Sequence, residues 1–282
     1  MPKVVLITGC STGIGRDLAE RLSQHGYLVV ATARKAETLN DLPVAMKLPL
    51  DVTQTDSVNE ALASTLQQFG RIDILVNNAG YSVPGALEEV SEGQTQQVFD
   101  VNVFGALRMI RAVAPHMRKQ RSGCILNLSS IAGKLSTPGN GTYSATKFAL
   151  EALSDALRLE LAPFGIQVIV IEPGAIKTQF DETAQAQAEH ILSDSASPYR
   201  PLYEKSRQFA AGMRQHEPGP EDVSKIIQQA IEASHPRARY LAAIPFSGKL
   251  VLSLRDFLWD LVLRQIFRIH TPLPDGALSA HV

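Results

Sequence analysis

A tyrosine and a lysine four residues apart, Tyr143 and Lys147, are the side chains in this sequence whose types and spacing best suit proton transfer. Residues four apart on a helix lie on one face, so the ammonium can lie near the phenol and favour the phenolate. An unperturbed tyrosine titrates near ~10 and is a poor acid or base at neutral pH. The neighbouring cation is therefore expected to lower the pKa of Tyr143. Such a pair also occurs by chance on solvated helix faces, so its meaning depends on what surrounds it.

A serine completes the candidate set. Ser130 follows the apolar run Cys124–Leu128, and Tyr143 opens the next segment with a helical pattern. Ser130 can hydrogen-bond a substrate oxygen while Tyr143 passes a proton to it, and Lys147 can also hold a cofactor ribose. If a nicotinamide delivers hydride to the adjacent carbon, the set interconverts a carbonyl and an alcohol.

The elements that must position these residues follow from the hydrophobic pattern. Short apolar runs alternate with segments of helical period, which is typical of βαβ units and of a parallel sheet buried on both faces. Seven strands are expected, near Val4–Thr8, Leu28–Ala33, Met46–Leu50, Ile74–Asn77, Cys124–Leu128, Val168–Ile171 and Tyr240–Ala243. Helices are expected near Gly15–Gln24, Ser57–Phe69, Gln94–Arg118, Tyr143–Ala162 and Glu221–Ala233. Right-handed crossovers then predict a single doubly wound α/β domain with its ligand crevice at the carboxyl ends of the strands.

A glycine-rich loop joins the first predicted strand to the first helix. It runs Thr8-Gly9-Cys10-Ser11-Thr12-Gly13-Ile14-Gly15. Glycines at such a turn let the backbone approach a pyrophosphate, whose charge is favoured by unpaired N–H groups and by the positive end of the helix dipole. The loop is therefore predicted to bind a dinucleotide, although glycine is common in strand-to-helix turns of every kind.

The end of the second strand indicates which dinucleotide. Sites that use NAD carry an acidic residue there, which hydrogen-bonds the ribose 2′-hydroxyl. In this sequence the strand ends Ala33-Arg34-Lys35, without a carboxylate. A guanidinium can hold a 2′-phosphate through paired, charge-assisted hydrogen bonds, so Arg34 favours NADP(H). The alternative is that Arg34 and Lys35 are solvated loop charges.

These motifs, over about residues 1 to 245, closely resemble the short-chain dehydrogenase/reductase family. Further marks are Asn77-Asn78-Ala79-Gly80 after the fourth strand, Asn102 in Val101-Asn102-Val103, and Pro173-Gly174 after the sixth strand. The glycine loop and the long C-terminus resemble the branch that contains 17β-hydroxysteroid and retinol dehydrogenases and bacterial aldehyde or ketone reductases.

The resemblance implies a Rossmann fold, a nicotinamide cofactor and a role for each matching residue. It implies Asn102, Ser130, Tyr143 and Lys147 as the catalytic set, with Asn102 supporting a water-linked proton relay behind Lys147. It implies contacts of Ser11 with the 2′-phosphate, of Asp51 and Val52 with the adenine, and of Ile176 and Thr178 with the carboxamide end of the nicotinamide. The expected cofactor-binding residues are Gly9, Ser11, Thr12, Gly13, Ile14, Gly15, Arg34, Asp51, Val52, Asn78, Ala79, Gly80, Tyr143, Lys147, Pro173, Gly174, Ile176 and Thr178.

Composition narrows the classes of partner. The 27 basic and 28 acidic residues give no excess charge that would attract nucleic acid, so a small-molecule substrate is expected. Cys10 and Cys124 lie far apart, which predicts neither a disulfide framework nor a metal site and suits a reducing, cytoplasmic compartment. No stretch approaches the ~20 uncharged apolar residues of a membrane span. The family resemblance implies a homo-oligomer, either a dimer or a tetramer.

The predicted dinucleotide-binding catalytic domain spans residues 1–245, contains one insertion and is followed by a C-terminal extension of the same domain. Residues 181–216 are polar, carry Pro198 and Pro201, and are expected to form a lid insertion over the substrate. The apolar residues in and beside it that are expected to line a substrate pocket are Phe180, Leu192, Tyr199, Leu202, Tyr203, Phe209 and Met213. Residues 246–282 are expected to form a C-terminal helical extension whose amphipathic pattern suits packing on the domain or a second subunit, a lid, or a peripheral membrane contact. All three suit an apolar substrate.

The sequence thus predicts an NADP(H)-dependent oxidoreductase that interconverts an apolar aldehyde or ketone and its alcohol, with Tyr143 as general acid and base. A non-catalytic NADP(H)-sensing or scaffold protein would share the cofactor loop. An epimerase or dehydratase of nucleotide sugars would share Tyr143 and Lys147, but these enzymes have a differently spaced glycine loop and a larger substrate domain.

Overall fold

The computed structural model describes residues 1–214, 217–244 and 265. Its centre is a parallel sheet in the order β3-β2-β1-β4-β5-β6-β7. The strands are β1 (Val4–Ile7), β2 (Leu28–Ala33), β3 (Met46–Pro49), β4 (Ile74–Asn77), β5 (Gly123–Leu128), β6 (Ile166–Pro173) and β7 (Arg239–Ala242). The chain builds outward from β1 to β3, then crosses back to β4 and continues outward to β7, which is the doubly wound arrangement. The predicted seven-stranded parallel sheet is confirmed.

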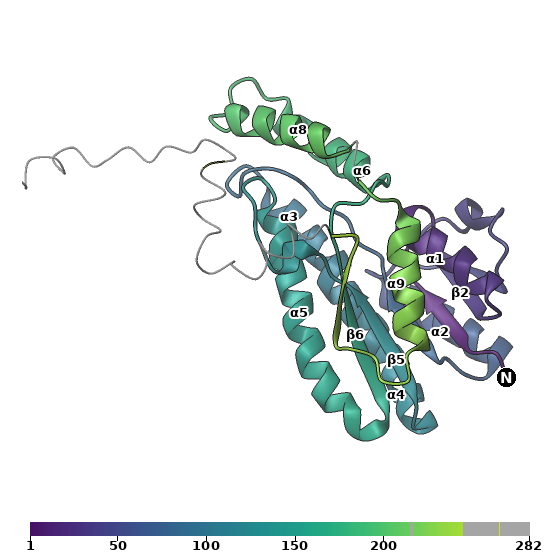
Figure 1. The fold of residues 1–282 in the computed structure, drawn as a ribbon. Coiled ribbons are helices and arrows are strands. Elements are labelled where there is room, and N and C mark those ends of the chain that lie inside the picture. Colours follow the sequence, from purple (N-terminus) through teal and green to yellow (C-terminus); the bar gives the residue numbers. More distant parts are fainter. Residues whose placement is uncertain (215–216, 245–264, 266–282) are drawn as a thin grey trace, which may run out of the picture.

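Helices cover both faces of this sheet, as its continuous apolar strands require. They are α1 (Gly13–Gln24), α2 (Thr55–Phe69), α4 (Ala106–Gln120), α5 (Gly141–Leu161) and α9 (Pro220–Glu232). Residues of α1 and α9 share one apolar core with the strands, whereas α2, α4 and the end of α5 pack into the core on the opposite face. Figure 1 shows α1 and α9 side by side on one face. The sheet is therefore rigid on both sides, and the chain leaves it for the loops at the carboxyl ends of the strands.

The helix predicted at Gln94–Arg118 is divided. It consists of α3 (Glu92–Phe99), a π-helical turn η2 (Asp100–Gly105) and α4. A capping box fixes the start of α3, since the Ser91 hydroxyl accepts the Gln94 N–H while the Gln94 side chain reaches back to the Ser91 N–H. The apolar period continues through the interruption, so periodicity gave no sign of the wide turn. Asn102 lies in that turn.

The segment expected as a lid insertion contains three helices, α6 (Phe180–Gln187), α7 (Glu189–Leu192) and α8 (Arg200–Arg214). Figure 1 shows α6 and α8 beyond one end of the sheet. They are joined to the body by a third apolar cluster, whose buried members are Val83, Ala86, Val90, Val98, Ala188, Ile191 and Tyr203. This cluster connects α7 and α8 to the loop after β4. The polar segment is therefore folded and packs against the body of the protein.

Two short 3₁₀ helices complete the described elements that matter for the site: η1 (Ala36–Leu39) after β2 and η3 (Ile131–Gly133) after β5. Apart from residue 265, the C-terminal extension predicted at residues 246–282 lies outside the described residues. Among the helices of residues 1–214 and 217–244, none combines the length and apolar character needed to cross a lipid bilayer.

Candidate active site

A cavity of about 1090 Å³ opens at the carboxyl ends of the strands, where the sequence predicted the ligand crevice. All but two of the predicted site residues line it. The lining members of that set are Gly9, Ser11, Thr12, Gly13, Ile14, Arg34, Asp51, Val52, Asn78, Ala79, Gly80, Ser130, Tyr143, Lys147, Pro173, Gly174, Ile176 and Thr178. The two exceptions, Gly15 and Asn102, are not in the lining. One cavity therefore joins the predicted cofactor loop to the predicted proton-transfer residues.

The glycine loop is held against the end of β4 by the side chain of Asn78 and by close packing of the backbone. Asn78 donates its amide N–H bonds to the carbonyl oxygens of Thr8 and Gly9, at 2.8 and 2.9 Å. Gly9 has a φ of +73°, and a Cβ there would lie 2.9 Å from the Cα of Ala79. A Cβ on Gly15 would lie 2.5 Å from the carbonyl oxygen of Gly9. Gly15 thus permits close packing inside the loop and does not itself face the cavity, which differs from the contact expected of it.

The start of α1 suits a bound phosphate. No side chain caps this terminus, and its first turn contains no acidic residue. The N–H groups of the turn therefore keep their hydrogen-bonding capacity, and no carboxylate competes for the positive end of the helix dipole. The residues present fit a dinucleotide, with its pyrophosphate at Gly9–Ile14.

The region expected to hold the adenine end lies beside β2 and after β3. Arg34 is exposed and lines the cavity directly after the end of β2. Asp51 lines it too, but one oxygen of its carboxylate accepts hydrogen bonds from the N–H and hydroxyl of Thr53, at 2.9 and 2.8 Å. Near the end of β2, the positive charge that lines the cavity is therefore Arg34.

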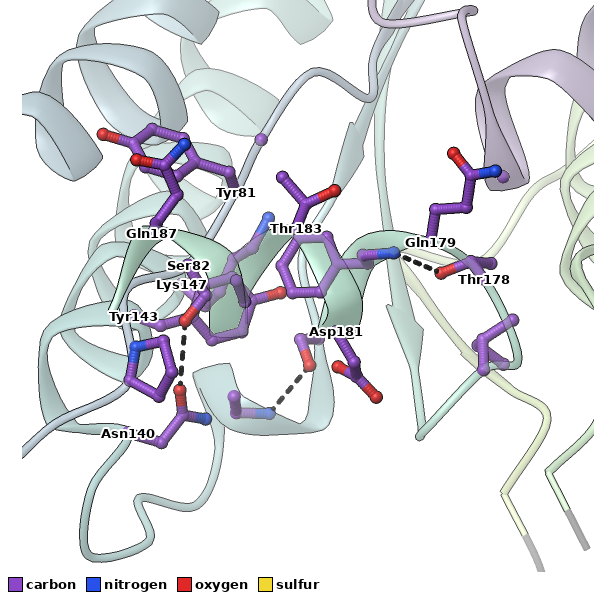
Figure 2. Close-up of a pocket in the computed structure, with 18 of the residues that line it drawn as sticks. Tyr81, Ser82, Asn140, Tyr143, Lys147, Thr178, Gln179, Asp181, Thr183 and Gln187 are labelled. Atoms are coloured by element: carbon purple, nitrogen blue, oxygen red, sulfur yellow. Dashed lines mark hydrogen bonds between the residues drawn. The ribbon is translucent and has the colours of Figure 1, made fainter. Parts of the chain in front are cut away.

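The three residues predicted for proton transfer meet in one wall of the cavity. The Lys147 Nζ lies 5.5 Å from the centre of the Tyr143 ring and donates a hydrogen bond to the Leu128 carbonyl oxygen at 2.7 Å. Ser130 ends the loop after β5, where its Oγ accepts the Ala132 N–H at 3.1 Å and lies 3.4 Å from the Pro173 carbonyl oxygen. Figure 2 shows Tyr143 and Lys147 side by side in this pocket. The spacing of four on α5 produces the predicted shared face.

The expected fall in the pKa of Tyr143 does not occur in this structure. Burial raises the pKa of the Tyr143 phenol above its ordinary value, a hydrogen bond with Ser130 opposes that rise, and the charge of Asp181 adds to it. The Phe180 ring lies 5.5 Å from the Tyr143 ring, centre to centre. Both Phe180 and Asp181 belong to α6, so the lid helix produces part of the environment that outweighs the lysine.

Lys147 has the opposite perturbation. Burial lowers its pKa to about 8, and the charge of Glu151 opposes this effect. Its ammonium is buried, with the Leu128 carbonyl oxygen as a hydrogen-bond acceptor. A lysine in this condition can change its protonation state near neutral pH, unlike an exposed one.

Asn102 is buried and connects the loop after β4 to helix α5. Its amide donates to the Tyr81 carbonyl oxygen at 2.9 Å and to the Thr146 hydroxyl at 3.1 Å, and its amide oxygen accepts the Tyr81 N–H at 3.0 Å. Thr146 in turn donates to the carbonyl oxygen of Tyr143 at 2.7 Å. The side chain of Asn102 is thus committed to holding the loop after β4 against the turn of α5 that carries Tyr143.

Several polar lining residues were not predicted from the sequence. Among those labelled in Figure 2 are Tyr81, Ser82, Asn140, Gln179, Asp181, Thr183 and Gln187. The Ser82 hydroxyl donates to the Asn140 amide oxygen at 3.4 Å and so links two loops that line the cavity. Tyr81 and Ser82 directly follow the Asn77–Gly80 run, so continuing that run by two residues would have found them. The residues of α6 had no comparable signal.

The apolar lid residues are divided between two environments. Phe180, Leu192, Tyr203 and Phe209 line the cavity as predicted. Tyr199 and Leu202 do not, because they pack against the third apolar cluster instead. The side chain of Met213 lies outside the described part of the chain.

Comparison with known proteins agrees with this geometry. Residues 3–189 match the family model of the short chain dehydrogenases. Retinol dehydrogenase 8 of Homo sapiens is 36% identical over 95% of this chain and 90% of its own length. The 17-beta-hydroxysteroid dehydrogenase type 1 of Homo sapiens is 35% identical over 90% of this chain and 81% of its own length. The chain belongs to the short-chain dehydrogenase/reductase family.

Solved structures show the same fold with either dinucleotide. A short-chain dehydrogenase/reductase of Burkholderia phymatum in complex with NAD is 29% identical, with a TM-score of 0.78 over 96% of this chain and 98% of its own. A metagenomic short-chain oxidoreductase in complex with NADP is 25% identical, with a TM-score of 0.66 over 85% of this chain and 96% of its own. The chain is therefore an oxidoreductase of a small molecule that uses a nucleotide cofactor.

Proposed function

We propose that this protein is an NADP(H)-dependent oxidoreductase that interconverts an apolar carbonyl compound and its alcohol, with Tyr143 as general acid and base. One observation carries the proposal. Tyr143, Ser130 and Lys147 line the same cavity as the glycine loop, so a dinucleotide held at Gly9–Ile14 shares one space with the proton-transfer residues.

Each side chain has a distinct task. The Ser130 hydroxyl donates a hydrogen bond to the substrate oxygen and holds it beside the Tyr143 phenol. Tyr143 gives its proton to that oxygen during reduction and takes it back during oxidation. Its raised pKa in this structure favours the protonated phenol, which is the form that a reduction needs. When bound, the nicotinamide supplies or accepts the hydride.

Lys147 and Asn102 support the reacting tyrosine. The Lys147 ammonium beside the Tyr143 ring stabilises the phenolate that a proton transfer leaves behind. The Asn102 side chain is engaged with Tyr81 and Thr146, and it supports a water-linked proton relay behind Lys147 by holding these two residues in place. Through Thr146, which donates to the Tyr143 carbonyl oxygen, Asn102 also holds the turn of α5 that carries Tyr143.

An apolar substrate fits the lid side of the cavity. Leu135, Phe180, Leu192 and Phe209 line it, and the substrate approaches between them and Tyr143. Relatives named for retinol and for a hydroxysteroid support the same class of substrate. Residues 181–216 then act as the substrate lid.

The preference for NADP(H) rests on Arg34. Its guanidinium lies at the cavity directly after β2, where enzymes that use NAD carry a carboxylate for the ribose 2′-hydroxyl. A 2′-phosphate placed there pairs with Arg34, and the nearby Ser11 hydroxyl is a further donor.

Replacing Tyr143 by phenylalanine tests the reaction. The Tyr143→Phe variant keeps the ring and its packing but has no proton to transfer, so turnover falls by roughly 10²- to 10⁴-fold. The substrates are short and long-chain aldehydes, retinal, ketosteroids and β-ketoacyl thioesters, with cofactor oxidation followed by absorbance and NADPH binding by fluorescence. Retained turnover in this variant contradicts the mechanism. Tight NADPH binding by the wild type, without oxidation across the panel, indicates a sensing or scaffold protein instead.

Cofactor choice is tested by comparing NADPH and NADH on the wild type and on Arg34→Asp. The wild type is expected to prefer NADPH, and the variant to reverse or abolish that preference because its carboxylate repels a 2′-phosphate. Glu37→Gln, in η1, is a control for a nearby change of charge outside the cavity lining. A wild type that prefers NADH would overturn the assignment of NADP(H).

A further inference from the structure

Two acidic and two basic side chains form a cluster behind the wall that carries Ser130 and Lys147. We call it the rear charge cluster: Lys134, Glu151, Glu172 and Arg239. Arg239 Nε lies 2.9 Å from Glu151 Oε2 and 3.3 Å from Glu172 Oε1. Lys134 Nζ lies 3.7 and 3.3 Å from the same two oxygens. None of the four lines the cavity.

The cluster joins the turn after β5, helix α5, the end of β6 and strand β7. Lys134 directly follows η3, the turn that begins at Ser130. Glu151 lies one helical turn beyond Lys147 on α5. Glu172 immediately precedes Pro173, whose carbonyl oxygen faces the Ser130 hydroxyl, and Arg239 begins β7, the edge strand. The cluster therefore ties the serine turn, the lysine helix and the end of β6 to one another.

The contact between the turn and the helix is close. A Cβ on Gly133 would lie 3.1 Å from the Cγ of Glu151 and 3.1 Å from the carbonyl oxygen of Lys147. The side chain of Glu151 thus packs directly beneath η3, beside the backbone of Lys147. A substitution of Glu151 is therefore expected to affect both the turn that carries Ser130 and the helix that carries Lys147.

Both carboxylates are buried, with side-chain exposures of 8% for Glu151 and 4% for Glu172. Buried carboxylates are costly unless they are paired, and Arg239 and Lys134 provide that pairing. Arg239 is shared, because it also contacts Asp155 at 2.7 Å, and Asp155 contacts Arg158 at 2.7 Å. Within the described residues, Oε1 of Glu151 has no hydrogen-bond partner. The charge of Glu151 also acts on Lys147, because it opposes the fall in pKa that burial causes there.

We propose that Glu151 is a positioning residue for the reaction: held by Arg239 and Lys134, it fixes the Ser130 turn against α5 and maintains the positive charge of Lys147. The inference deepens the proposed function and rests on it, because the charge of Lys147 has value only where Tyr143 transfers a proton. The pKa of Lys147 agrees with this role, because burial lowers it to about 8 and the charge of Glu151 opposes that fall.

The first test measures Lys147 directly in the protein without added cofactor. Lysines are labelled with ¹³C at Cε, the Lys147 resonance is assigned with Lys147→Met, and its titration is followed by NMR. In Glu151→Gln, which keeps the shape and removes the charge, we expect the Lys147 titration to move to lower pH by about half a unit. Glu160→Gln, an exposed charge on the same helix, is the matched control and leaves the titration unchanged.

The second test measures the reaction. For carbonyl reduction, kcat/KM of the wild type falls as the pH rises and Lys147 loses its proton. In Glu151→Gln this alkaline fall in kcat/KM moves to lower pH, by the same amount as the NMR titration. In Glu151→Asp, which keeps the charge, the fall stays close to its position in the wild type. A loss of packing alone would lower kcat/KM equally at every pH, and it would affect the shorter Asp side chain more than the isosteric Gln.

Arg239→Gln provides a prediction of opposite sign and remains available if Glu151→Gln does not fold. Removing this positive charge leaves Glu151 less neutralised, so Lys147 titrates at higher pH than in the wild type. An unchanged Lys147 titration in the folded variants overturns the inference. A shifted titration in a protein that oxidises no NADPH supports the role of Glu151 at Lys147 and contradicts the proposed function, so the two failures are distinguishable.

Discussion

The two walls of the cavity are built from different kinds of contact. The wall formed by the loops after β1 and β4 depends on backbone atoms: Gly9 and Gly15 approach neighbouring main-chain atoms so closely that a Cβ would overlap them, and Asn78 binds two carbonyl oxygens. Substitutions in this wall therefore have few ways to relax, because moving a main-chain atom displaces a whole strand or helix.

The wall formed by α6 to α8 depends on side chains. Tyr203 donates its hydroxyl to Glu89 and accepts the Ala86 N–H at 2.9 Å, while Ser197 donates to the other oxygen of Glu89 at 2.5 Å. Nearby, Tyr199 donates to Glu88 at 2.7 Å. The difference teaches that the cofactor side tolerates almost no change of residue, whereas the lid side can change its residues, and with them its substrates, while the sheet remains intact.

The largest expected effect tests the backbone wall. Gly9→Ala introduces a Cβ against the Cα of Ala79 and keeps a positive φ, so we expect a loss of roughly 3 kcal/mol in the free energy of unfolding, measured in urea, and a severe loss of cofactor binding. Gly26→Ala is the matched control, because Gly26 also has a positive φ but nothing within 4 Å of a Cβ. It is expected to lose only about 1 kcal/mol. Equal losses in the two variants would show that backbone strain, and not close approach, governs Gly9.

A smaller effect tests the lid wall. Tyr203→Phe keeps the buried ring but leaves the Ala86 N–H and Glu89 without their partner, so local opening of residues 194–203 should become easier by about 1–2 kcal/mol. Hydrogen exchange measures this opening. Tyr199→Phe removes a more exposed hydrogen bond and should change it by less than ~0.5 kcal/mol. If Tyr203→Phe also weakened cofactor binding tenfold, the two walls would not be independent.

The smallest effect is pH-dependent and confined to the lid. Burial and the hydrogen bond to Glu89 raise the pKa of Tyr203 to about 12. Because the folded state favours the protonated phenol, its contribution to lid stability is present below the unfolded pKa near ~10 and is lost as the pH rises through about 12. The absorbance titration of tyrosinate in the wild type should therefore contain a component near pH 12 that Tyr203→Phe lacks. A Tyr203 that ionises near pH 10 would show that the lid does not hold it.

What the sequence predicted correctly depends on local causes. The strands follow from continuous apolar runs such as Val4–Ile7, the glycine loop from a strand-to-helix turn, and the meeting of Tyr143 with Lys147 from a spacing of four on a helix. Each of these properties is decided within a few residues. The sheet then brings the local features together, because its parallel strands all end at one edge.

What could not be predicted depends on contacts between distant segments. Tyr203 and Glu89 are 114 positions apart, and no local pattern indicates that they meet. The raised pKa of Tyr143 depends on α6, which arrives from beyond β6. The rear charge cluster likewise gathers single residues from four elements, so neither Glu151 nor Arg239 was singled out by the sequence.

The π-helical turn at Asp100–Gly105 has a consequence for how this chain can vary in length. Each residue advances a regular helix by about 100°, and a wide turn changes the angular phase of everything after it. Within the turn Asn102 hydrogen-bonds Tyr81, and beyond the turn Met109, Val113 and Met117 of α4 pack in the core against the sheet. Deleting one residue between Asn102 and Met109 would rotate one of these two sets out of place, so the number of residues between them is expected to be fixed.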